Sequence, residues 1–312
     1  QVSFAPLGDA GQQQLERGRA LICGCGALGS VIANTLVRGG VGFVRIVDRD
    51  FLELNNLQRQ VLYDEADVAA GLPKAIAAAG KLRAINSQVD IEPVVADVTF
   101  ANIEQLASDV DVIVDGTDNF EIRMLLNEFS VKQSVPWVYG GVIGGEGQTM
   151  TILPGETACF TCLMPELPAP GSTLTCDTAG VLGSVVGVIG SLQAVEALKI
   201  LSGNIGTTSG ELLVIDVWQN RVRRIALSPL VEAGGCPTCH QGQFPWLEGT
   251  RGGESLVLCG RNAVQIAAAG NGKTDLALLA DKLAPLGEVT QNVHLLRFAV
   301  EEFRLTIFAD GR

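Results

Sequence analysis

Positive charge is scarce in this chain. Its 312 residues include 22 Lys and Arg against 34 Asp and Glu, which gives a formal net charge of −12. A nucleic-acid-binding surface needs clustered Lys and Arg side chains to contact phosphates. We therefore expect no nucleic-acid partner. Any polyanionic ligand must be bound locally, by a few placed cations and by backbone amides.

Long apolar runs are almost absent as well. The most apolar stretch covers residues 178–195, carries no charge and is barely long enough to span a bilayer. Several glycines and Gln193 interrupt it, and Glu196 and Lys199 follow directly. We therefore predict a buried core helix and no membrane partner. No signal-peptide pattern is visible, although the sequence begins at Gln1 rather than Met, so we expect a cytoplasmic protein.

The low charge goes with a large apolar content. Hydrophobic residues make up 47% of the sequence and charged residues 18%, which indicates a well-buried globular protein. The length suits one large domain or two, and no internal repeat is evident. A Gly-, Pro- and Trp-rich segment over 241–253 reads as a linker. We expect a main domain over 1–248 and a small C-terminal domain over 249–312, incomplete because it ends abruptly.

Helices and strands are predicted to alternate in the first part of the chain. The expected elements are a helix over 9–18, a strand over 20–23, a helix over 30–37, a strand over 43–48, a helix over 73–85, a strand over 89–95, a helix over 103–107, a strand over 110–114 and a helix over 119–131. This alternation predicts a mostly parallel, Rossmann-like sheet with helices on both faces.

The pattern changes after Pro136. The later expected elements are antiparallel β-ribbons over 142–153 and 212–227, a Pro-, Gly- and Thr-rich loop over 165–176, and a long helix ending near residue 201. The last segment reads as a strand over 255–259, a helix over 274–286, and strands over 294–300 and 303–308. The predicted class is α/β, with antiparallel strands continuing the sheet and a small α+β appendix.

A glycine-rich loop follows the first predicted strand. Its glycines are Gly24, Gly26 and Gly29, and a helix is expected directly after them. Asp48 ends the second strand, 24 residues (48 − 24) after Gly24, close to the spacing of about 20 residues for a ribose-binding acid. Amides at the start of the helix attract phosphate. The pattern predicts a nucleotide site, and the alternative is an ordinary tight turn.

Two cations occur at the same edge of the predicted sheet. Arg59 lies in the loop after the second strand, and Lys74 follows Pro73 at the start of a helix. Ligands of such sheets bind at the carboxyl edge, so both cations suit a triphosphate. Proline fits the first helical position, whereas a cation there opposes the helix dipole. Lys74 is therefore either solvated or paired with an anion, and the alternative for both cations is a solvated surface charge.

Asp118 follows the fourth predicted strand, after Asp115-Gly116-Thr117. A carboxylate at that edge can hold Mg²⁺ against phosphates. Aspartate is equally a favoured N-cap for the helix that follows. The sequence leaves these two interpretations open.

Two Cys-x-x-Cys pairs lie far apart in the chain, Cys159 with Cys162 and Cys236 with Cys239. Together they offer the four thiolates of a tetrahedral structural zinc site. Two redox pairs are the alternative, but such pairs usually open a helix after a strand, and these lack that setting. His240 adjoins the last cysteine and is interpreted as a bystander.

The remaining cysteines lie in other settings. Cys176 falls in the Thr-, Pro- and Gly-rich loop, where a thiol can be a nucleophile or an unreactive side chain. Cys23, Cys25 and Cys259 occupy strand or glycine-loop positions, and we interpret them as packing residues. Eight cysteines in this context indicate a metal site and free thiols rather than a disulfide framework.

Taken together, these motifs resemble the ThiF/MoeB family of sulfur-carrier-protein adenylyltransferases, bacterial relatives of the ubiquitin-activating enzymes. The similar stretches run from about Ala10 to Cys239: Gly24 to Ser30, Asn56 to Gln60, Pro73-Lys74, Thr117-Asp118-Asn119 with Arg123, Glu146-Gly147-Gln148, both cysteine pairs, and Gly187 to Ala194. They occur in the family's order, and their joint specificity is high.

The resemblance implies an activity. The family uses ATP to activate the C-terminal glycine of a small ubiquitin-like sulfur-carrier protein that ends in Gly-Gly, forming an acyl-adenylate and releasing pyrophosphate. Its members work as symmetric dimers or fused pairs, so we expect a homodimer. Cations and Mg²⁺ supply the charge neutralisation that this reaction needs, and no histidine base is required.

The resemblance also implies roles for individual residues. Asp48 would bind the ribose, Arg59 and Lys74 the phosphates, Asp118 the Mg²⁺, and Asn56 and Gln60 would shape the nucleotide site. Cys176 matches a loop cysteine that takes part in thiol or persulfide chemistry in some members and is dispensable in others.

The sequence departs from the family pattern at two places. Ala27 stands where the family usually has Gly, and a basic Arg-Tyr-x-Arg-Gln segment, expected near the start, does not occur. A nicotinamide-dependent oxidoreductase would share the glycine loop and Asp48, but it would not explain Arg59, Lys74, Asp118 and the zinc site together. A scaffold that binds a carrier without adenylating it is the other alternative.

Overall fold

The computed structural model describes residues 1–168, 179–251, 257–258, 263–264, 274–293, 295–301 and 303–308. They belong to two compact units, Gln1–Gly252 and Gly253–Arg312. Apart from Cys176, the predicted site residues all lie within the described part of the first unit. Cys176 and Cys259 lie outside the described residues.

A single eight-stranded sheet forms the centre of the first unit, in the order β3-β2-β1-β4-β5-β6-β7-β8. Its strands are β1 (Arg19–Cys23), β2 (Phe43–Val47), β3 (Asp90–Val94), β4 (Val112–Asp115), β5 (Trp137–Ile143), β6 (Glu146–Ile152), β7 (Glu211–Asp216) and β8 (Arg221–Ala226). The first five strands in the sheet order pair in parallel, and β6, β7 and β8 continue the sheet antiparallel. The predicted Rossmann-like sheet with an antiparallel continuation is confirmed.

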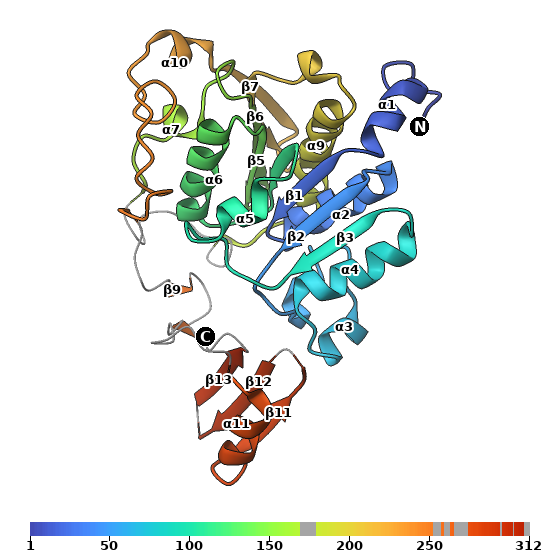
Figure 1. Cartoon of the computed structure of the whole chain (residues 1–312), viewed down its shortest axis with the longest axis vertical. Helices are drawn as coiled ribbons and strands as arrows, with labels where there is room; N and C mark the ends of the chain where they lie inside the picture. Colours follow the sequence, from blue (N-terminus) through green and yellow to red (C-terminus); the bar gives the residue numbers. More distant parts are fainter. Residues whose placement is uncertain are drawn as a thin grey trace. The chain divides into compact units, whose positions relative to one another are not determined.

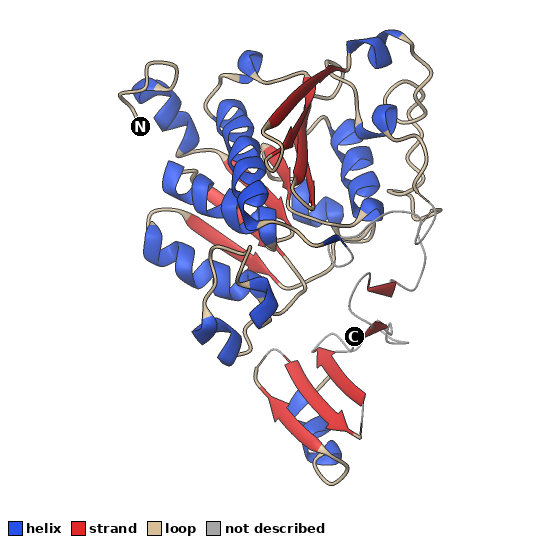
Figure 2. Cartoon of the chain, turned by 180° about the vertical axis from the view of Figure 1, so that it is seen from behind, coloured by secondary structure: helices blue, strands red, loops and turns tan. Residues whose placement is uncertain are grey.

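Helices cover both faces of this sheet. They are α1 (Gly8–Leu15), α2 (Ala27–Gly39), α3 (Glu65–Ala69), α4 (Lys74–Ile85), α5 (Ile103–Ala107), α6 (Phe120–Gln133), α7 (Phe160–Leu163), α9 (Gly183–Leu201) and α10 (Ser228–Glu232), with 3-10 turns η1 (Leu54–Asn56) and η2 (Ile205–Thr207). Helices α2 and α9 lie on one side of the central strands, and α5 and α6 lie on the other (Figure 1). Figure 2 shows the molecule from behind, with the side that carries α2 and α9 toward the viewer.

Each face of the sheet has its own hydrophobic core. Apolar residues of α2, α4 and α9 form the first core, and those of α5 and α6 form the second. The second core contains an aromatic cluster in which the Phe160 ring lies 4.9 Å from that of Tyr139 and 5.7 Å from that of Trp137. Burial of each such ring contributes about 2–3 kcal/mol. This cluster fixes the start of β5 beside the first cysteine pair.

Helix α9 is the longest helix among the described residues. It is also the one helix among them whose length and apolar composition would allow it to cross a membrane. It packs on α2 so closely that a Cβ at Gly190 would lie 2.9 Å from Val31 Cβ. Val185 and Ile189 are fully buried on the same side of the helix. In this structure α9 is therefore a core helix of the α/β unit.

The second unit is a small α+β fold. Its elements are β9 (Val257–Leu258), β10 (Ala263–Val264), α11 (Leu276–Leu283), β11 (Glu288–Gln291), β12 (Leu295–Val300) and β13 (Phe303–Phe308). Strands β11, β12 and β13 form an antiparallel sheet in that order. Leu276 and Ala280 of α11 pack on Leu296 and Phe298 of β12. This arrangement confirms the predicted α+β appendix.

Several elements differ from the sequence-based expectations. Strand β5 begins at Trp137, so the ribbon expected over 142–153 is the end of β5 followed by β6. The start of β5 is buried on both faces and therefore shows no alternation of apolar and polar residues. Strand β11 was not expected. Pro73 is the N-cap of α4 and not its first helical residue, with φ −58° and ψ 143°.

A buried glutamate holds the chain that follows the second cysteine pair. Glu128 of α6 is 2% exposed, and its Oε2 accepts hydrogen bonds of 2.9 Å from the backbone N–H groups of Trp246 and Leu247. Burial raises the pKa of Glu128 from 4.5 to about 7, and the carboxylate of Glu248 adds to the rise while Arg251 and the two N–H groups oppose it. The carboxyl therefore titrates near neutral pH.

This titration gives a pH-dependent stability. A carboxyl whose pKa is higher in the folded state binds its proton more tightly there, so its contribution is full below pH 4.5 and is lost as pH rises to about 7. Glu128→Gln keeps an oxygen that can accept both N–H groups without the charge. We expect the variant to be more stable than wild type by about 1–2 kcal/mol at pH 8 and equal to it at pH 5. Thermal unfolding of both proteins from pH 5 to 8 measures this, and parallel curves would contradict it.

Candidate nucleotide and metal sites

The carboxyl ends of β1 and β4 form the switch point of the sheet. The chain reaches β2 and β3 on one side of β1 and returns on the other side as β4, and ligands of open α/β sheets bind at such a point. A Cβ at Gly29 would lie 1.9 Å from the Gly24 carbonyl oxygen, and a Cβ at Gly116 would lie 2.3 Å from the same atom. Glycine is therefore required where these two turns meet. Gly26 has only the Gln60 Nε2 nearby, at 3.7 Å from a Cβ position, so the loop is open on that side.

Asp48 is tied to the glycine loop. It is 9% exposed, its Oδ2 accepts a 2.7 Å hydrogen bond from the Cys25 backbone N–H, and its Oδ1 accepts one from the Asp50 N–H. Burial raises the pKa of Asp48, and the nearby Lys74 ammonium opposes that rise. A carboxylate can accept about four hydrogen bonds, so two positions remain for ligand hydroxyl groups.

Lys74 is paired rather than solvated. Its side chain is buried, 4% exposed as a residue, and its Nζ lies 3.2 Å from Asp50 Oδ2. Of the two readings that the sequence left open, pairing with an anion is the correct one. Arg59 is half-buried, its Nη1 donates to the Asn55 carbonyl oxygen at 2.9 Å, and no ion pair is recorded for it within the described part of the chain.

Asn56 and Gln60 shape the loop between these cations. Asn56 is 3% exposed and closes η1, because its Oδ1 accepts the Glu53 N–H at 3.2 Å. Gln60 is 4% exposed, and its Oε1 has no hydrogen-bond partner among the residues that the structure describes. A buried carbonyl oxygen left without a donor costs about 1–3 kcal/mol. A hydrogen-bond donor on a ligand bound beside Gly26 would satisfy the Gln60 Oε1.

Asp118 projects from the turn after β4. It is exposed, and no hydrogen bond or ion pair is recorded for it over the described ranges. The N-cap of α6 is Asn119, whose Oδ1 accepts from the N–H groups of Glu121 at 2.8 Å and Ile122 at 3.3 Å. The interpretation of Asp118 as a helix cap is therefore wrong. Its carboxylate is left available to a cation.

Beneath this turn lies a buried ion pair. Arg123 Nε donates to Asp115 Oδ2 at 3.1 Å, and its Nη2 donates to the Thr117 carbonyl oxygen at 2.6 Å. Burial raises the pKa of Asp115, and the Arg123 charge opposes the rise. Removing one member of such a pair leaves an uncompensated buried charge. The pair therefore sets the position of the backbone that carries Asp118.

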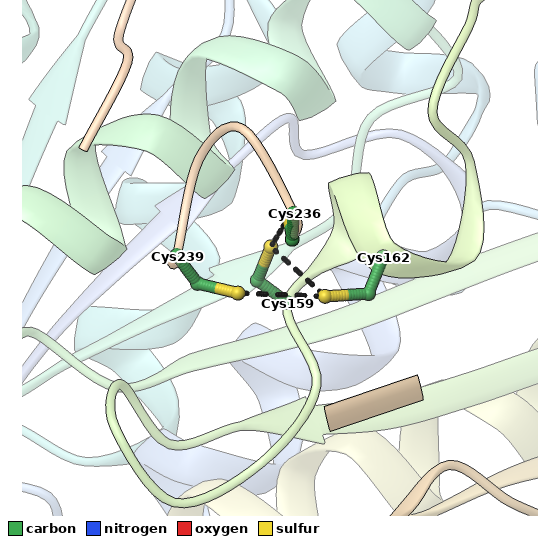
Figure 3. Close-up of side chains that lie close together, drawn as sticks. All are labelled: Cys159, Cys162, Cys236 and Cys239. Atoms are coloured by element: carbon green, nitrogen blue, oxygen red, sulfur yellow. Dashed lines mark hydrogen bonds between the residues drawn. The ribbon is translucent and has the colours of Figure 1, made fainter. Parts of the chain in front are cut away.

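The four cysteines predicted to bind a metal come together, as Figure 3 shows. Their sulfur atoms all lie within 4.8 Å of one another. The Cys159 sulfur is 3.8 Å from that of Cys162 and 3.7 Å from that of Cys236, and the sulfurs of Cys162 and Cys239 are 3.4 Å apart. A tetrahedron with Zn–S bonds of about 2.3 Å has edges of about 3.8 Å. The donor set therefore fits zinc, and the cysteine pairs are not two separate redox sites.

Thiol ionisation and hydrogen bonds prepare this cluster. The hydrogen bond between Cys159 and Cys162 lowers the pKa of Cys159. Asn127 of α6 is fully buried, and its Nδ2 donates to Thr161 Oγ1 at 2.9 Å. Thr161 in turn lies 3.0 Å from Thr238 Oγ1, which joins the two Cys-x-x-Cys turns. Composition and spacing gave no sign of this role for Asn127.

The other cysteines divide as follows. Cys23 and Cys25 are fully buried, and burial raises the pKa of Cys25 to about 12, as suits packing residues. His240 is exposed, with its Nδ1 3.4 Å from the Cys239 sulfur. Asp50 supports the site by pairing with Lys74, and Asp115 supports it by pairing with Arg123. The sequence gave no signal for either aspartate, because only their partners belong to the motifs.

Residues 1–238 match the model of the ThiF family. The chain belongs to the ThiF family. The sulfur carrier protein ThiS adenylyltransferase of Bacillus subtilis is 42% identical over 313 aligned positions, which cover 100% of this chain and 92% of the relative. The SAMP-activating enzyme E1 of Haloferax volcanii is 38% identical over 242 positions, covering 78% of this chain and 87% of that protein. The family resemblance read from the motifs is confirmed.

Solved structures show the same fold. MccB of E. coli aligns with a TM-score of 0.65 and 21% identity, over 75% of this chain and 68% of that one. The structure of MccB with ATP aligns with a TM-score of 0.60 and 21% identity, over 70% of this chain and 66% of the other. Identity at this level supports the fold alone.

Proposed function

We propose that this member of the ThiF family adenylates the C-terminal glycine of a small ubiquitin-like sulfur-carrier protein with ATP and releases pyrophosphate. The observation that carries the proposal is the similarity to a ThiS adenylyltransferase, 42% identical over 100% of this chain. Four observations support it: Asp48 accepts the Cys25 N–H of the glycine loop, Lys74 lies close enough to Asp48 to influence its pKa, Arg59 adjoins Gln60 near Gly26, and Asp118 follows β4, which pairs with β1. The thiamine, molybdopterin and tRNA-thiolation branches share these motifs, so the proposal names no single carrier.

In the proposed reaction, an oxygen of the carrier's terminal carboxylate forms a bond to the α-phosphorus. The bond from that phosphorus to the oxygen bridging to the β-phosphorus breaks, and pyrophosphate leaves with the electron pair. Asp48 accepts hydrogen bonds from the ribose, and the loop amides at Gly26 face the phosphates. Arg59 and Lys74 stabilise the charge that develops on the leaving pyrophosphate. Asn56 and Gln60 hold the loop that carries Arg59.

Asp118 is the residue that we assign to Mg²⁺. The ion, when bound, neutralises phosphate charge, which an acidic protein with few cations needs. Asp118 fits because its carboxylate is exposed at the switch point and is not used as the helix cap. The Arg123–Asp115 pair keeps the Asp118 turn in place from below. Cys176 is proposed only as a possible site of later thiol chemistry on the carrier.

Zinc is the metal that we assign to Cys159, Cys162, Cys236 and Cys239. Four sulfur ligands at tetrahedral spacing leave no open position, so the role is structural. The site ties α7 to the segment that follows β8. We assign residues 1–248 to the adenylation domain and 249–312 to an accessory domain.

Two exposed surfaces suit protein partners. On β8 and the turn before it, Trp218 is 74% and Val222 62% exposed, and Arg223 lies on the same strand. We assign the exposed apolar side chains of this segment to the carrier protein. Arg223 is paired with Glu146 and, as the neighbour of Val222 in the strand, points to the other face. On α9, Val188 is 37% exposed and Val195 is 45% exposed. Exposed apolar side chains on one helix suit the interface of a symmetric homodimer. We place the protein in the cytoplasm.

ATP–pyrophosphate exchange tests the proposed function. Labelled pyrophosphate should enter ATP when the full chain is mixed with Mg²⁺ and a carrier ending in Gly-Gly, because the adenylate forms reversibly. A carrier lacking its last glycine is the matched control and should give no exchange. Exchange with one carrier would name the pathway. No exchange with any carrier, from protein that still binds ATP, would favour the non-catalytic scaffold.

A further inference from the structure

The carboxyl end of β4 and the start of β5 are not joined by the sheet alone. The two strands pair at only two positions, Ile113 with Trp137 and Val114 with Val138. The carbonyl oxygen of Asp115, the last residue of β4, accepts its hydrogen bond from a side chain instead. Gln193 of α9 donates its Nε2 to that oxygen at 2.7 Å, and a longer contact of 3.4 Å reaches the Val138 carbonyl oxygen.

The Gln193 carboxamide fills its space tightly. It is fully buried, and a Cβ at Gly140 of β5 would lie 2.3 Å to 2.4 Å from the carboxamide atoms. Only glycine at this position of β5 leaves room for the Gln193 carboxamide. The Gln193 Oε1 has no hydrogen-bond partner across the described residues. The hydrogen bonds that Nε2 donates therefore come with a cost of about 1–3 kcal/mol at the unsatisfied Oε1.

Arg123 completes the arrangement from the opposite face of the sheet. Its Nη2 donates to the Gly140 carbonyl oxygen at 3.0 Å and to that of Thr117 at 2.6 Å. Helix α6 supplies Arg123 and helix α9 supplies Gln193, on the two sides of the strands (Figure 1). The backbone from Asp115 to Thr117 is therefore held from above and below, directly before Asp118.

We propose that Gln193 is a positioning residue for the cation site at Asp118. By donating to the Asp115 carbonyl oxygen, it fixes where β4 ends and so where the Asp118 carboxylate stands relative to the glycine loop. Gly140 is its necessary counterpart on β5. This inference rests on the proposed function, because it takes Asp118 to be the residue that binds the divalent cation beside ATP.

The test uses two variants that remove the same contact from different elements. Gln193→Met keeps the length of the side chain and removes the unsatisfied Gln193 oxygen, but it leaves the Asp115 carbonyl oxygen without this donor. The two effects offset each other, so its stability should stay close to that of wild type. Gly140→Ala places a methyl group where the carboxamide lies. Each variant should weaken Mn²⁺ binding in the presence of a non-hydrolysable ATP analogue at least about tenfold, by electron paramagnetic resonance. The double variant should be no worse than either single one.

The same variants are compared in pyrophosphate exchange. Gln193→Met should raise the Mg²⁺ concentration for half-maximal exchange by a similar factor while leaving the KM for the carrier unchanged. Ala197→Gly, at a fully buried position one turn further along α9, is the matched control and should lower stability without changing the Mg²⁺ requirement.

The outcomes separate the inference from the proposed function. Exchange in wild type with an unchanged Mg²⁺ requirement in Gln193→Met overturns the positioning role alone. Absence of exchange in wild type overturns the proposed function, and the Mn²⁺ comparison then still decides on Gln193. Wild-type protein that binds neither the nucleotide analogue nor Mn²⁺ overturns both.

Discussion

Asp118→Ala is expected to reduce ATP–pyrophosphate exchange by a factor of at least about 10³ while leaving the fold intact. The side chain is exposed and makes no recorded hydrogen bond or ion pair in the described structure, so its removal costs little stability. Its carboxylate is the anion that we place against the Mg²⁺ of MgATP. Initial exchange rates and thermal unfolding of both proteins give the comparison.

Neighbouring variants separate this role from a structural one. Asn119→Ala removes the N-cap of α6 and should lower stability by about 1 kcal/mol, with a far smaller effect on exchange. Asp118→Asn keeps the shape of the side chain and removes its charge, so it should be nearly as inactive as Asp118→Ala. Exchange at the wild-type rate in either Asp118 variant would remove this residue from the cation site.

The sequence predicted the architecture because its signals were local. The first strand, the glycine loop, the following helix and the acid at the end of the second strand lie within one stretch of chain, and short-range patterns are enough to identify them. The two cysteine pairs also carry their own spacing. The start of β5 was missed because Trp137, Val138 and Tyr139 are all buried, and an apolar run on both faces shows no period.

The supporting residues of the site could not be predicted in the same way. Asp50 matters because the fold brings it to Lys74, 24 residues further along the chain. Gln193 matters because α9 passes the end of β4 and the start of β5, 78 residues after Asp115. Asp118 shows the reverse case. Its neighbour Asn119 is an equally good cap, and only the structure shows which of the two side chains accepts the helix N–H groups.

Cys162→Ser is expected to have the largest effect on stability. It removes one of four sulfur ligands from a site that joins α7, after β6, to the segment after β8, two parts of the chain 77 residues apart. A structural zinc site contributes folding free energy directly. A loss of about 3–5 kcal/mol would lower the unfolding temperature of a unit of this size by roughly 10 °C. Zinc content per chain should fall from one toward zero.

The matched control is Cys23→Ala, because Cys23 is fully buried in β1 and is not among the four metal-binding cysteines found in the described residues. It should cost stability through lost packing and keep its zinc. Chelation of the wild-type protein should lower the unfolding temperature to that of Cys162→Ser and have no further effect on the variant. Helix α6 should loosen as well, because Asn127 links it to Thr161 between the two ligands. A metal-free protein as stable as wild type would show that the four cysteines do not hold a structural zinc.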